Sequence, residues 1–484
     1  MITRLEIEGF KAFGARQIAT LAPITLIYGT NSSGKSALLQ SLLFLKQSDE
    51  VGYPTYAGPH VDLASARHVT FRHEESLRPS VAIAFPALFS RQGVKEIAVG
   101  LRLGLGRLPA ARSPKAFELD LVLDGRPGPR VDGHGQFVDK LAHAAFLDFI
   151  RSANPEWSER QWSQVIHMFD ALGGEDAMLL FDAPRQLFPV VMDSLSVLRD
   201  MWDAEYEDSG EGFINEVSKL PVSEDEVENI LETFSIYREG LASPWDLISR
   251  DFGSALRGVR HLGPVRPAPA RQLSEEAGMT STLQSLKGEA REQLAMWCSY
   301  LGLPYEFTAE TLGDAASGVS TATRVTDLRN SLTLALTDVG YGVSQVLPLL
   351  LKGLDGGRLG SYETTLVEQP ELHLHPRQQG HLADFFLWSS GLCNDFGKSI
   401  TIPKIKYRTQ WILETHSEAL ISRIQRRIRQ GLVDPKQVSV VFVEPGPEGS
   451  RLIPLRLNES GEFIDEWPGG FFEETYWDLF GGLQ

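Results

Sequence analysis

Hydrophobic and polar residues follow the patterns of strands and helices at both ends of the chain. Near the start, Ile2, Leu5 and Ile7 alternate with polar residues, whereas residues 24–28 form a continuous apolar run. Alternation is typical of a strand with one face in solvent, and a continuous run is typical of a strand buried on both faces. A helical pattern follows from Ser36. Alternating stretches that predict an antiparallel layer come next, at 79–85, 96–103 and 117–125.

The middle of the chain, residues 138–260, changes to a helical and acidic pattern. Within it, the span 200–232 contains twelve acidic residues and one basic residue, Lys219. Such a run is interpreted as a solvated surface, with a docking site or a mimic of nucleic-acid charge as the sharper alternative. We therefore expect an insertion that divides the sheet-forming parts of the chain.

Strand and helix patterns return in the C-terminal part of the chain. Helices are expected near 291–303 and 344–354, and strands are expected near 331–339, 364–368 and 409–414. The Pro-rich stretch 261–271 is expected to be extended or looped. Because strands and helices alternate at both ends of the chain, the sequence favours an α/β fold with a largely parallel sheet.

Composition narrows the class of protein. The 484 residues are 42% hydrophobic and 23% charged, which is ordinary for a globular protein. The formal net charge of −17 argues against a chain that coats DNA through bulk electrostatics. Cys298 and Cys393 form no disulfide framework, and no apolar run has the length of a signal peptide or a membrane span. We expect a reduced, cytoplasmic protein without a membrane partner.

The segment GTNSSGKS fits the phosphate-loop pattern G-x-x-x-x-G-K-[ST], and it lies between a buried-type strand and a helix. Backbone N–H groups of such a loop face phosphate oxygens, and the helix N-terminus adds a favourable field. Lys35 is predicted to reach the β- and γ-phosphates, and the Ser36 hydroxyl is predicted to bind Mg²⁺. The predicted nucleotide-binding residues are Gly29, Thr30, Asn31, Ser32, Ser33, Gly34, Lys35 and Ser36.

Two later motifs place polar groups after apolar strands. Glu368 is the first carboxylate after the apolar residues of LVEQPELHLHP, and we predict that it holds Mg²⁺ beside Ser36. His416 follows the apolar run of ILETHSEAL and is predicted to sense the γ-phosphate. His373 and His375 lack a third placed ligand, so packing or loop geometry explains them better than zinc.

A Gly-rich turn, DVGYGVSQ, precedes a strongly apolar helix. Ser344 is expected to cap this helix, and the N–H groups at the cap would form a second anion site. An ordinary glycine turn with a good cap is the alternative interpretation.

In this order, the motifs FKAFG (residues 10–14), GTNSSGKS, DVGYGVSQ, LVEQPELHLHP and ETHSE resemble the ABC-type ATPases of the SMC, RecF and OLD group. The segment His261–Arg271 and the C-terminal GEFIDEWPGGFFEE resemble compact prokaryotic members of that group that act in anti-phage defence. The resemblance covers about 1–100 and 255–484. It implies an ATPase head with a mixed central sheet, an antiparallel β layer and a helical insertion.

The resemblance also implies a division of labour and a mechanism. It makes 1–137 an N-terminal ATPase lobe, 138–260 an acidic helical insertion and 261–484 a C-terminal ATPase lobe. Two copies would sandwich ATP and Mg²⁺, with the signature residues Gly342, Ser344 and Gln345 meeting the γ-phosphate bound by the partner copy.

One position departs from the pattern of the resembled group. Members that hydrolyse ATP well usually carry a second acid after the metal-binding one, and here that position is Gln369. An amide can orient water but cannot accept its proton. With Gln369, Glu371 and His416 as the catalytic candidates, three outcomes stay open: slow turnover, rescue by Glu371, or binding without hydrolysis.

Three functions compete at this point. The first is an ATPase that dimerises around nucleotide and regulates an effector protein, such as a nuclease, in anti-phage defence. The second is a DNA-repair ATPase, whose DNA contact would involve Arg423, Arg426 and Arg427 on one predicted helix. A basic stretch before this helix, with Lys398, Lys404, Lys406 and Arg408, could join that contact. An acidic partner surface is the other possible ligand of these basic residues, and a solvated helix face is the alternative interpretation. The third is a non-hydrolysing scaffold. A toprim nuclease site is not expected, because Glu444 is followed by proline and lacks a companion D-x-D.

Overall fold

The computed structural model describes residues 1–51, 53–74, 76–86, 96–103, 117–123, 126–132, 252–264, 277–312, 320–354, 362–396, 403 and 408–472. Several predicted features lie outside these residues: the acidic span 200–232, nearly all of the predicted insertion, residues 265–271, and Lys398, Lys404 and Lys406.

The chain folds into two compact units that do not follow contiguous segments. The N-terminal unit contains Ile2–Ile18 and Ala37–Arg257, and the C-terminal unit contains Met1, Ala19–Ser36 and Gly258–Gln484. The phosphate loop, which the lobe prediction assigned to residues 1–137, therefore belongs with the C-terminal segments.

The N-terminal unit is built on an antiparallel sheet with the strand order β2-β1-β4-β5-β6-β7. Its strands are β1 (Arg4–Glu8), β2 (Gln17–Thr20), β4 (Ser80–Pro86), β5 (Glu96–Leu103), β6 (Phe117–Leu123) and β7 (Arg126–Asp132). β1 pairs with β4, and each later strand pairs antiparallel with the next. The antiparallel layer predicted from alternation is confirmed. Helix α2 (Ala66–Val69) also belongs to this unit, and so does helix α1 (Lys35–Val51) from Ala37 onward.

The C-terminal unit is built on a mixed sheet with the order β15-β14-β3-β13-β12-β8. The strands are β3 (Ile24–Gly29), β8 (Val259–Leu262), β12 (Tyr362–Glu368), β13 (Arg408–Glu414), β14 (Val438–Glu444) and β15 (Arg451–Pro454). All neighbours pair parallel except β14 and β15. Since the described residues combine this mixed sheet with antiparallel sheets and helices, the predicted α/β fold class is confirmed.

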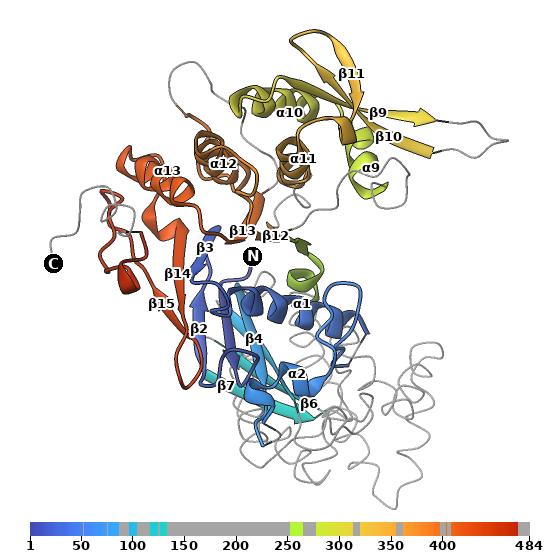
Figure 1. Cartoon of the computed structure of the whole chain (residues 1–484). Helices are drawn as coiled ribbons and strands as arrows, with labels where there is room; N and C mark the ends of the chain where they lie inside the picture. The colour runs from blue at the N-terminus through green and yellow to red at the C-terminus, as the bar shows by residue number, and fades with distance from the viewer. Residues whose placement is uncertain are drawn as a thin grey trace, which may run out of the picture. The chain divides into compact units, whose positions relative to one another are not determined.

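Five helices and a second sheet complete the described part of the C-terminal unit (Figure 1). The helices are α9 (Ala277–Ser285), α10 (Glu289–Tyr300), α11 (Tyr341–Leu354), α12 (Pro376–Ser389) and α13 (Glu418–Arg429). The second sheet joins β9 (Tyr305–Leu312), β10 (Ser320–Asp327) and β11 (Leu332–Ala335) as antiparallel neighbours. β11 is shorter than the strand expected at 331–339, because a 3₁₀ turn replaces its second half at Leu336–Asp338.

Aromatic side chains hold the helices of this unit to its parallel sheet. Trp297, Trp388 and Trp411 are fully buried, and Trp411 of β13 lies 4.8 Å from Phe386 of α12 between ring centroids. Trp297 of α10 contacts Phe385 of α12 at 5.1 Å with an edge-to-face geometry. Such pairs add about 0.5–1.5 kcal/mol beyond the burial of their area. The strand ends of the sheet therefore rest on a rigid core.

Local sequence also fixes where the helices begin. Ser417 caps α13 by accepting a hydrogen bond from Leu420 N at 3.1 Å. His375 caps α12 in a capping box with Gln378, and Pro376 occupies the first helical position. His373 has a positive φ of 62° and its ring lies 4.7 Å from that of Tyr341. Both histidines of the LHLHP segment thus have structural contacts, in agreement with the expectation that packing or loop geometry explains them.

No described helix has both the length and the apolar content that crossing a membrane requires. Cys298 and Cys393 are buried thiols and are not joined by a disulfide. Burial raises the pKa of the Cys298 thiol to about 12.

Candidate nucleotide site at the strand ends

The phosphate loop connects the end of β3 to the start of α1. Gly29 has a φ of 150°, and a Cβ at this position would lie 2.6 Å from the carbonyl oxygen of Val443 on β14. Only glycine fits such a close approach between neighbouring strands. Thr30, Asn31 and Ser32 are exposed, so the tip of the loop faces solvent and its backbone can meet a ligand.

The base of the loop is buried and anchored. Ser33 is fully buried, and its carbonyl oxygen accepts a hydrogen bond of 2.6 Å from Ser450 Oγ, which precedes β15. Gly34 follows with a φ of 104°. The loop predicted from its glycines and its flanking elements is therefore held by a residue that the motif does not contain.

Lys35 begins α1, and its side chain turns back over the loop. Its Nζ donates to the carbonyl oxygens of Gly29 at 3.0 Å and Thr30 at 2.8 Å. The side chain is buried, and this burial lowers the pKa of the ammonium group, against the opposing effect of Glu414 and Glu371. The positive charge therefore lies at the base of the loop, where a phosphate ligand would meet it.

Ser36 lies beside a carboxylate that the sequence analysis did not select. Its Oγ donates to Glu414 Oε2 at 2.8 Å. Glu414 is the last residue of β13, which is the neighbour of β3 in the sheet. Burial raises the pKa of the Glu414 carboxyl; the hydrogen bond from Ser36 lowers it, and the nearby Glu368 raises it. A usable signal existed, since Glu414 ends an apolar strand directly before Thr415 and His416.

Glu368, the predicted metal-binding residue, has a different partner. It is the last residue of β12 and is paired in register with Glu414. Its Oε1 lies 2.8 Å from His261 Nε2 of β8, which is the next strand outward. His261 belongs to the segment His261–Arg271 that carries part of the resemblance, but sequence reasoning gave it no role at the site. The structure thus brings Glu414 into contact with Ser36, and it places Glu368 between Glu414 and His261.

Gln369 follows β12 in a left-handed backbone conformation. Its φ is 45°, which is uncommon for a residue other than glycine. Its backbone N–H donates to the Glu414 carbonyl oxygen at 2.7 Å, so the turn is tied to the end of β13. Strained backbone of this kind persists where the surroundings hold it, and it clusters at functional sites.

Glu371 is directed at the loop that carries His416. Its Oε1 accepts a hydrogen bond of 2.7 Å from His416 N, and its Oε2 accepts one of 2.8 Å from Thr415 Oγ1. The side chain is buried. Both carboxylate oxygens are therefore engaged by the segment that follows β13. The geometry therefore favours a positioning role for Glu371 over the rescue role that the sequence left open.

His416 lies at the start of the loop that leads to α13. Burial lowers the pKa of its imidazole, and the positive charge of Lys35 lowers it further. The neutral imidazole is therefore favoured near neutral pH, with one N–H available as a donor. The ring of Phe471 lies 6.3 Å away between ring centroids.

Aromatic residues of the C-terminal segment GEFIDEWPGGFFEE pack against Tyr28 of β3. Trp467 and Phe472 contact Tyr28 at 5.3 Å and 5.5 Å between ring centroids. Tyr28 is fully buried, and its hydroxyl donates to the Ser417 carbonyl oxygen at 2.9 Å. These aromatic residues lie within the described part of GEFIDEWPGGFFEE, for which sequence reasoning offered a resemblance and no contact.

The predicted cap at Ser344 is wrong. Helix α11 begins at Tyr341, so Ser344 lies inside the helix, and its Oγ donates to the Tyr341 carbonyl oxygen at 2.7 Å. Ser344 and Gln345 are buried. The exposed start of the helix is formed by Gly340 and Tyr341 instead. Gly342 packs closely on the turn after β12, because a Cβ there would lie 2.7 Å from the His373 carbonyl oxygen.

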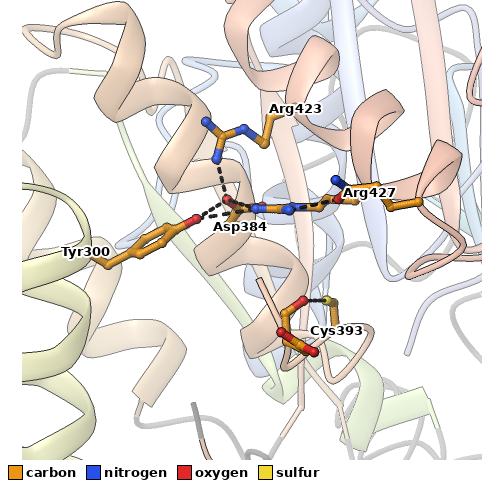
Figure 2. Close-up of polar contacts among 7 residues, drawn as sticks. Tyr300, Asp384, Cys393, Arg423 and Arg427 are labelled. Carbon is orange, nitrogen blue, oxygen red and sulfur yellow. Dashed lines mark hydrogen bonds and ion pairs between the residues drawn. The ribbon is translucent and has the colours of Figure 1, made fainter. Parts of the chain in front are cut away.

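The predicted DNA contact through Arg423 and Arg427 gains no support, because both side chains are engaged by Asp384. Figure 2 shows them converging on Asp384 of α12, a fully buried carboxylate. Arg427 donates through Nε at 2.7 Å and through its NH2 group at 2.8 Å, and Arg423 donates to the same carboxylate. Tyr300 OH adds a hydrogen bond of 2.7 Å. Of the three predicted arginines, only Arg426 is exposed.

A phosphate-bound magnesium ion is compatible with the groups present. Among the described residues, no group of three His, Cys, Asp or Glu side chains is arranged to hold a metal ion. The Ser36 hydroxyl and the carboxylates of Glu414 and Glu368 nevertheless offer oxygen ligands, which Mg²⁺ prefers. Mg²⁺ commonly takes one or two carboxylates and completes its shell with substrate phosphates and water.

Comparison with known proteins gave matches among solved structures. No protein of curated function matches the chain. Three solved structures align with 12–13% identity. The SMC head bound to the C-winged helix domain of ScpA covers 95% of this chain and 98% of its own, with a TM-score of 0.44. The SMC head with an extended coiled coil bound to the C-terminal domain of ScpA from Pyrococcus furiosus covers 94% of this chain and 96% of its own (TM-score 0.41), and the SMC head domain from Thermotoga maritima covers 94% and 99% (TM-score 0.38).

Two protein families match separate stretches of the sequence. Residues 4–60 match the family described as AAA domain, and residues 281–421 match the family described as AAA ATPase domain. The first stretch contains the phosphate loop, and the second contains the start of α11, Glu368, Glu414 and His416. The chain is therefore similar to AAA-type ATPases in both stretches that build the candidate site.

Proposed function

We propose that this protein binds ATP with Mg²⁺, hydrolyses it slowly, and pairs with a second copy around the nucleotide. The observation that carries the proposal is the meeting of Lys35 and Ser36 with the ends of β12 and β13. These two strands bring Glu368, Gln369, Glu414 and His416 to the edge of the sheet where the phosphate loop begins.

Each group in this arrangement has a chemical task. The Lys35 ammonium and the backbone N–H groups of the loop bind phosphate oxygens, and the N-terminus of α1 adds its dipole. Mg²⁺, when bound, neutralises charge on the phosphates. Gln369 orients the attacking water, and neutral His416 donates a hydrogen bond toward the terminal phosphate.

Slow turnover follows from the side chains available as a general base. The Gln369 amide accepts a hydrogen bond from water but takes no proton at neutral pH. Loss of a general base costs roughly 10²–10⁴-fold in rate. Glu371 is held by Thr415 and His416, so it positions the loop that carries His416 and does not serve as the general base in place of Gln369.

Pairing around the nucleotide draws support from the start of α11. Gly340 and Tyr341 are exposed there, and the backbone N–H groups of a helix N-terminus attract anions. Each contact of this type contributes about 0.3–1 kcal/mol when exposed and up to about 2 kcal/mol when partly buried. Two sites in a dimer could therefore couple the nucleotide state to pairing.

The biological setting rests on the resemblance of the motifs. On this basis the proposal is a cytoplasmic protein whose nucleotide state controls an effector protein, such as a nuclease, in anti-phage defence. The DNA-repair alternative is weakened because two of its three arginines, Arg423 and Arg427, bind Asp384 inside the protein. The non-hydrolysing scaffold stays as the second candidate, because Gln369 is the feature that favours it.

Turnover separates these two candidates. We expect wild-type protein to hydrolyse ATP at a low but measurable rate that depends on Lys35, and we expect Glu371→Gln to reduce it. Lys35→Ala, which removes the ammonium, should abolish nucleotide binding, measured with a fluorescent nucleotide. Fast wild-type turnover that Glu371→Gln leaves unchanged would contradict the slow-switch proposal, and binding with no turnover would favour the scaffold.

Pairing is best tested at Gly340. A Cβ there meets no atom within 4 Å, so Gly340→Arg adds bulk and charge at the exposed helix start without a clash inside the protein. We expect ATP to shift wild-type protein to a dimer in sedimentation experiments with a non-hydrolysable analogue, and we expect Gly340→Arg to remain monomeric. Leu328→Arg is the control, since Leu328 is an exposed side chain and the change adds the same bulk and charge away from the start of α11.

A further inference from the structure

We propose that His261 of β8 is a positioning residue, whose Nε2–H group holds the Glu368 carboxylate in the orientation that binds the magnesium ion of the nucleotide. This inference rests on the proposed ATP-binding function, in which Glu368 is the predicted metal-binding residue. His261 lies outside both the phosphate loop and the LVEQP motif. The proposal therefore extends the candidate site by one strand, to β8.

The pairing of β8 with β12 brings the two side chains to one face of the sheet. His261 is paired with Leu366, and Glu368 lies two residues farther along β12. Side chains two residues apart in a strand point to the same face, so the imidazole meets the carboxylate diagonally across the two strands. Both strands belong to the C-terminal unit. The contact is therefore built into the register of the sheet.

The hydrogen bond between these side chains has a defined direction. The His261 Nε2 atom lies 2.8 Å from Glu368 Oε1. Because an ionised carboxylate can only accept hydrogen bonds, the shared hydrogen belongs to Nε2. The side chains of His261 and Glu368 are 27% and 16% exposed, so the bond is largely shielded from solvent. It engages one of the two carboxylate oxygens and restricts rotation of the group.

A like charge on the other side of Glu368 increases the need for this anchor. Glu414 of β13 is paired in register with Glu368, and the two carboxylates interact unfavourably. A hydrogen-bond donor on β8 offsets this repulsion and keeps the Glu368 carboxylate in place at the strand end. Metal-binding carboxylates are commonly held by such outer partners, and loss of a partner typically costs about 10–100-fold in metal affinity.

A second ion pair between the same two strands supplies a matched control. Arg260 is paired with Thr365, and its Nε lies 2.9 Å from Oε1 of Glu363, two residues earlier on β12. Successive residues of a strand face opposite sides of the sheet, so this contact lies on the other face and near the start of β12. Loss of the Arg260 side chain therefore removes an equivalent link between β8 and β12 at a distance from the strand end that carries Glu368.

The test measures metal binding directly, with Mn²⁺ as the probe. Mn²⁺ affinity is determined by electron paramagnetic resonance on the whole chain in saturating ADP. We expect His261→Ala to weaken Mn²⁺ binding about tenfold. His261→Gln, whose amide N–H donates from a similar position, should stay within about threefold of wild type. Arg260→Ala should stay within about twofold.

Two further measurements separate positioning from a general loss of structure. ADP affinity in EDTA should stay within about twofold of wild type in every variant, because the phosphate loop is unchanged. In a Glu368→Ala background, Ser36 and the ADP phosphates can still bind the ion, and His261→Ala should cause no further loss of Mn²⁺ affinity. This lack of additivity is expected only if His261 acts through Glu368.

The outcomes are distinguishable. Wild-type Mn²⁺ affinity in His261→Ala, equal losses in His261→Ala and Arg260→Ala, or failure of His261→Gln to restore affinity would overturn the positioning role while leaving ADP binding intact. An additive loss in the Glu368→Ala background would also overturn it. Wild-type protein that binds no nucleotide, with or without a divalent cation, would instead overturn the proposed function and this inference with it.

Discussion

Two groups of buried charges in the C-terminal unit look alike in the sequence but differ in how they are balanced. In the arginine cluster, Asp384 is surrounded by Arg423, Arg427 and Tyr300, so one negative charge meets two positive charges and a hydroxyl (Figure 2). In the carboxylate cluster, Glu414 interacts unfavourably with Glu368 and Glu371, and Lys35 opposes this effect. Both oxygens of Asp384 accept hydrogen bonds from cationic groups, whereas Glu414 lies near two like charges.

The difference distinguishes a structural cluster from the proposed ligand site. A carboxylate whose oxygens all meet donors of the same molecule has no capacity left for a ligand, and it links α12 to α13. A group of carboxylates that repel one another costs stability unless a cation joins them. The balance of charge therefore identifies a binding site better than the presence of charged side chains does.

The largest expected effect comes from opening the arginine cluster. Asp384→Asn leaves the buried Arg427 and the half-buried Arg423 without their counter-charge, so we expect a loss of about 3–5 kcal/mol in the free energy of unfolding. Urea denaturation measures this loss. The double variant Asp384→Asn with Arg427→Met should recover part of it. A loss below about 1 kcal/mol would show that the cluster is not closed as described.

The next largest effect concerns the carboxylate cluster. Gln369→Glu adds a general base where the amide now stands, and we expect the rate of ATP hydrolysis to rise roughly 100-fold. Steady-state phosphate release measures the rate. Gln369→Asn is the control, because it shortens the side chain without adding a charge. An unchanged rate in Gln369→Glu would mean that another step limits turnover.

A third effect comes from Asp49 in the N-terminal unit, a buried carboxyl that belongs to neither cluster. Burial raises its pKa to about 7 from the ordinary value of 3.8, and Arg257 and Lys46 only partly oppose this shift. The folded state therefore keeps a proton that the unfolded state releases between about pH 4 and pH 7. Stability should fall as the pH rises through this window, by up to about 1.4 kcal/mol per pH unit.

Asp49→Asn should remove this dependence, because the amide does not titrate. The free energy of unfolding, measured in urea at pH 5, 6 and 7, should decline less steeply in the variant than in wild type. Parallel pH profiles would contradict a buried, protonated Asp49.

The smallest effect is expected at the exposed neighbour of the arginine cluster. Arg426 precedes Arg427 in sequence but faces solvent, so Arg426→Ala should change the free energy of unfolding by no more than about 0.5 kcal/mol. Arg427→Ala, examined in the same denaturation series, should lose several kcal/mol. Similar losses in both variants would remove the contrast between a buried and a solvated arginine.

The sequence predicted those features that depend on local pattern. The continuous apolar run at 24–28 and the spacing of GTNSSGKS were sufficient to place the phosphate loop between a buried strand and a helix. The antiparallel strands β4 and β5 followed from simple alternation. Backbone propensity and side-chain period determine these features, so they require no knowledge of distant contacts.

Features that depend on strand order and helix packing could not be predicted. Glu368 and Glu414 both end apolar strands, and only the order β3-β13-β12 decides which of them reaches Ser36. The spacing of the arginines on α13 indicates a common face but not what that face packs against. The start of α11 was misplaced by three residues, because Ser344 suits both a cap and the first turn of a helix.

The carboxylate of Glu371 has a consequence for how this architecture can change. One side chain from the turn after β12 fixes both the backbone and the hydroxyl of the segment that follows β13. A residue inserted into either segment would move one end of this bridge and leave the other end in place. Engineers who graft the histidine segment into a related scaffold would therefore need to transfer the glutamate-bearing turn with it, as a single cassette.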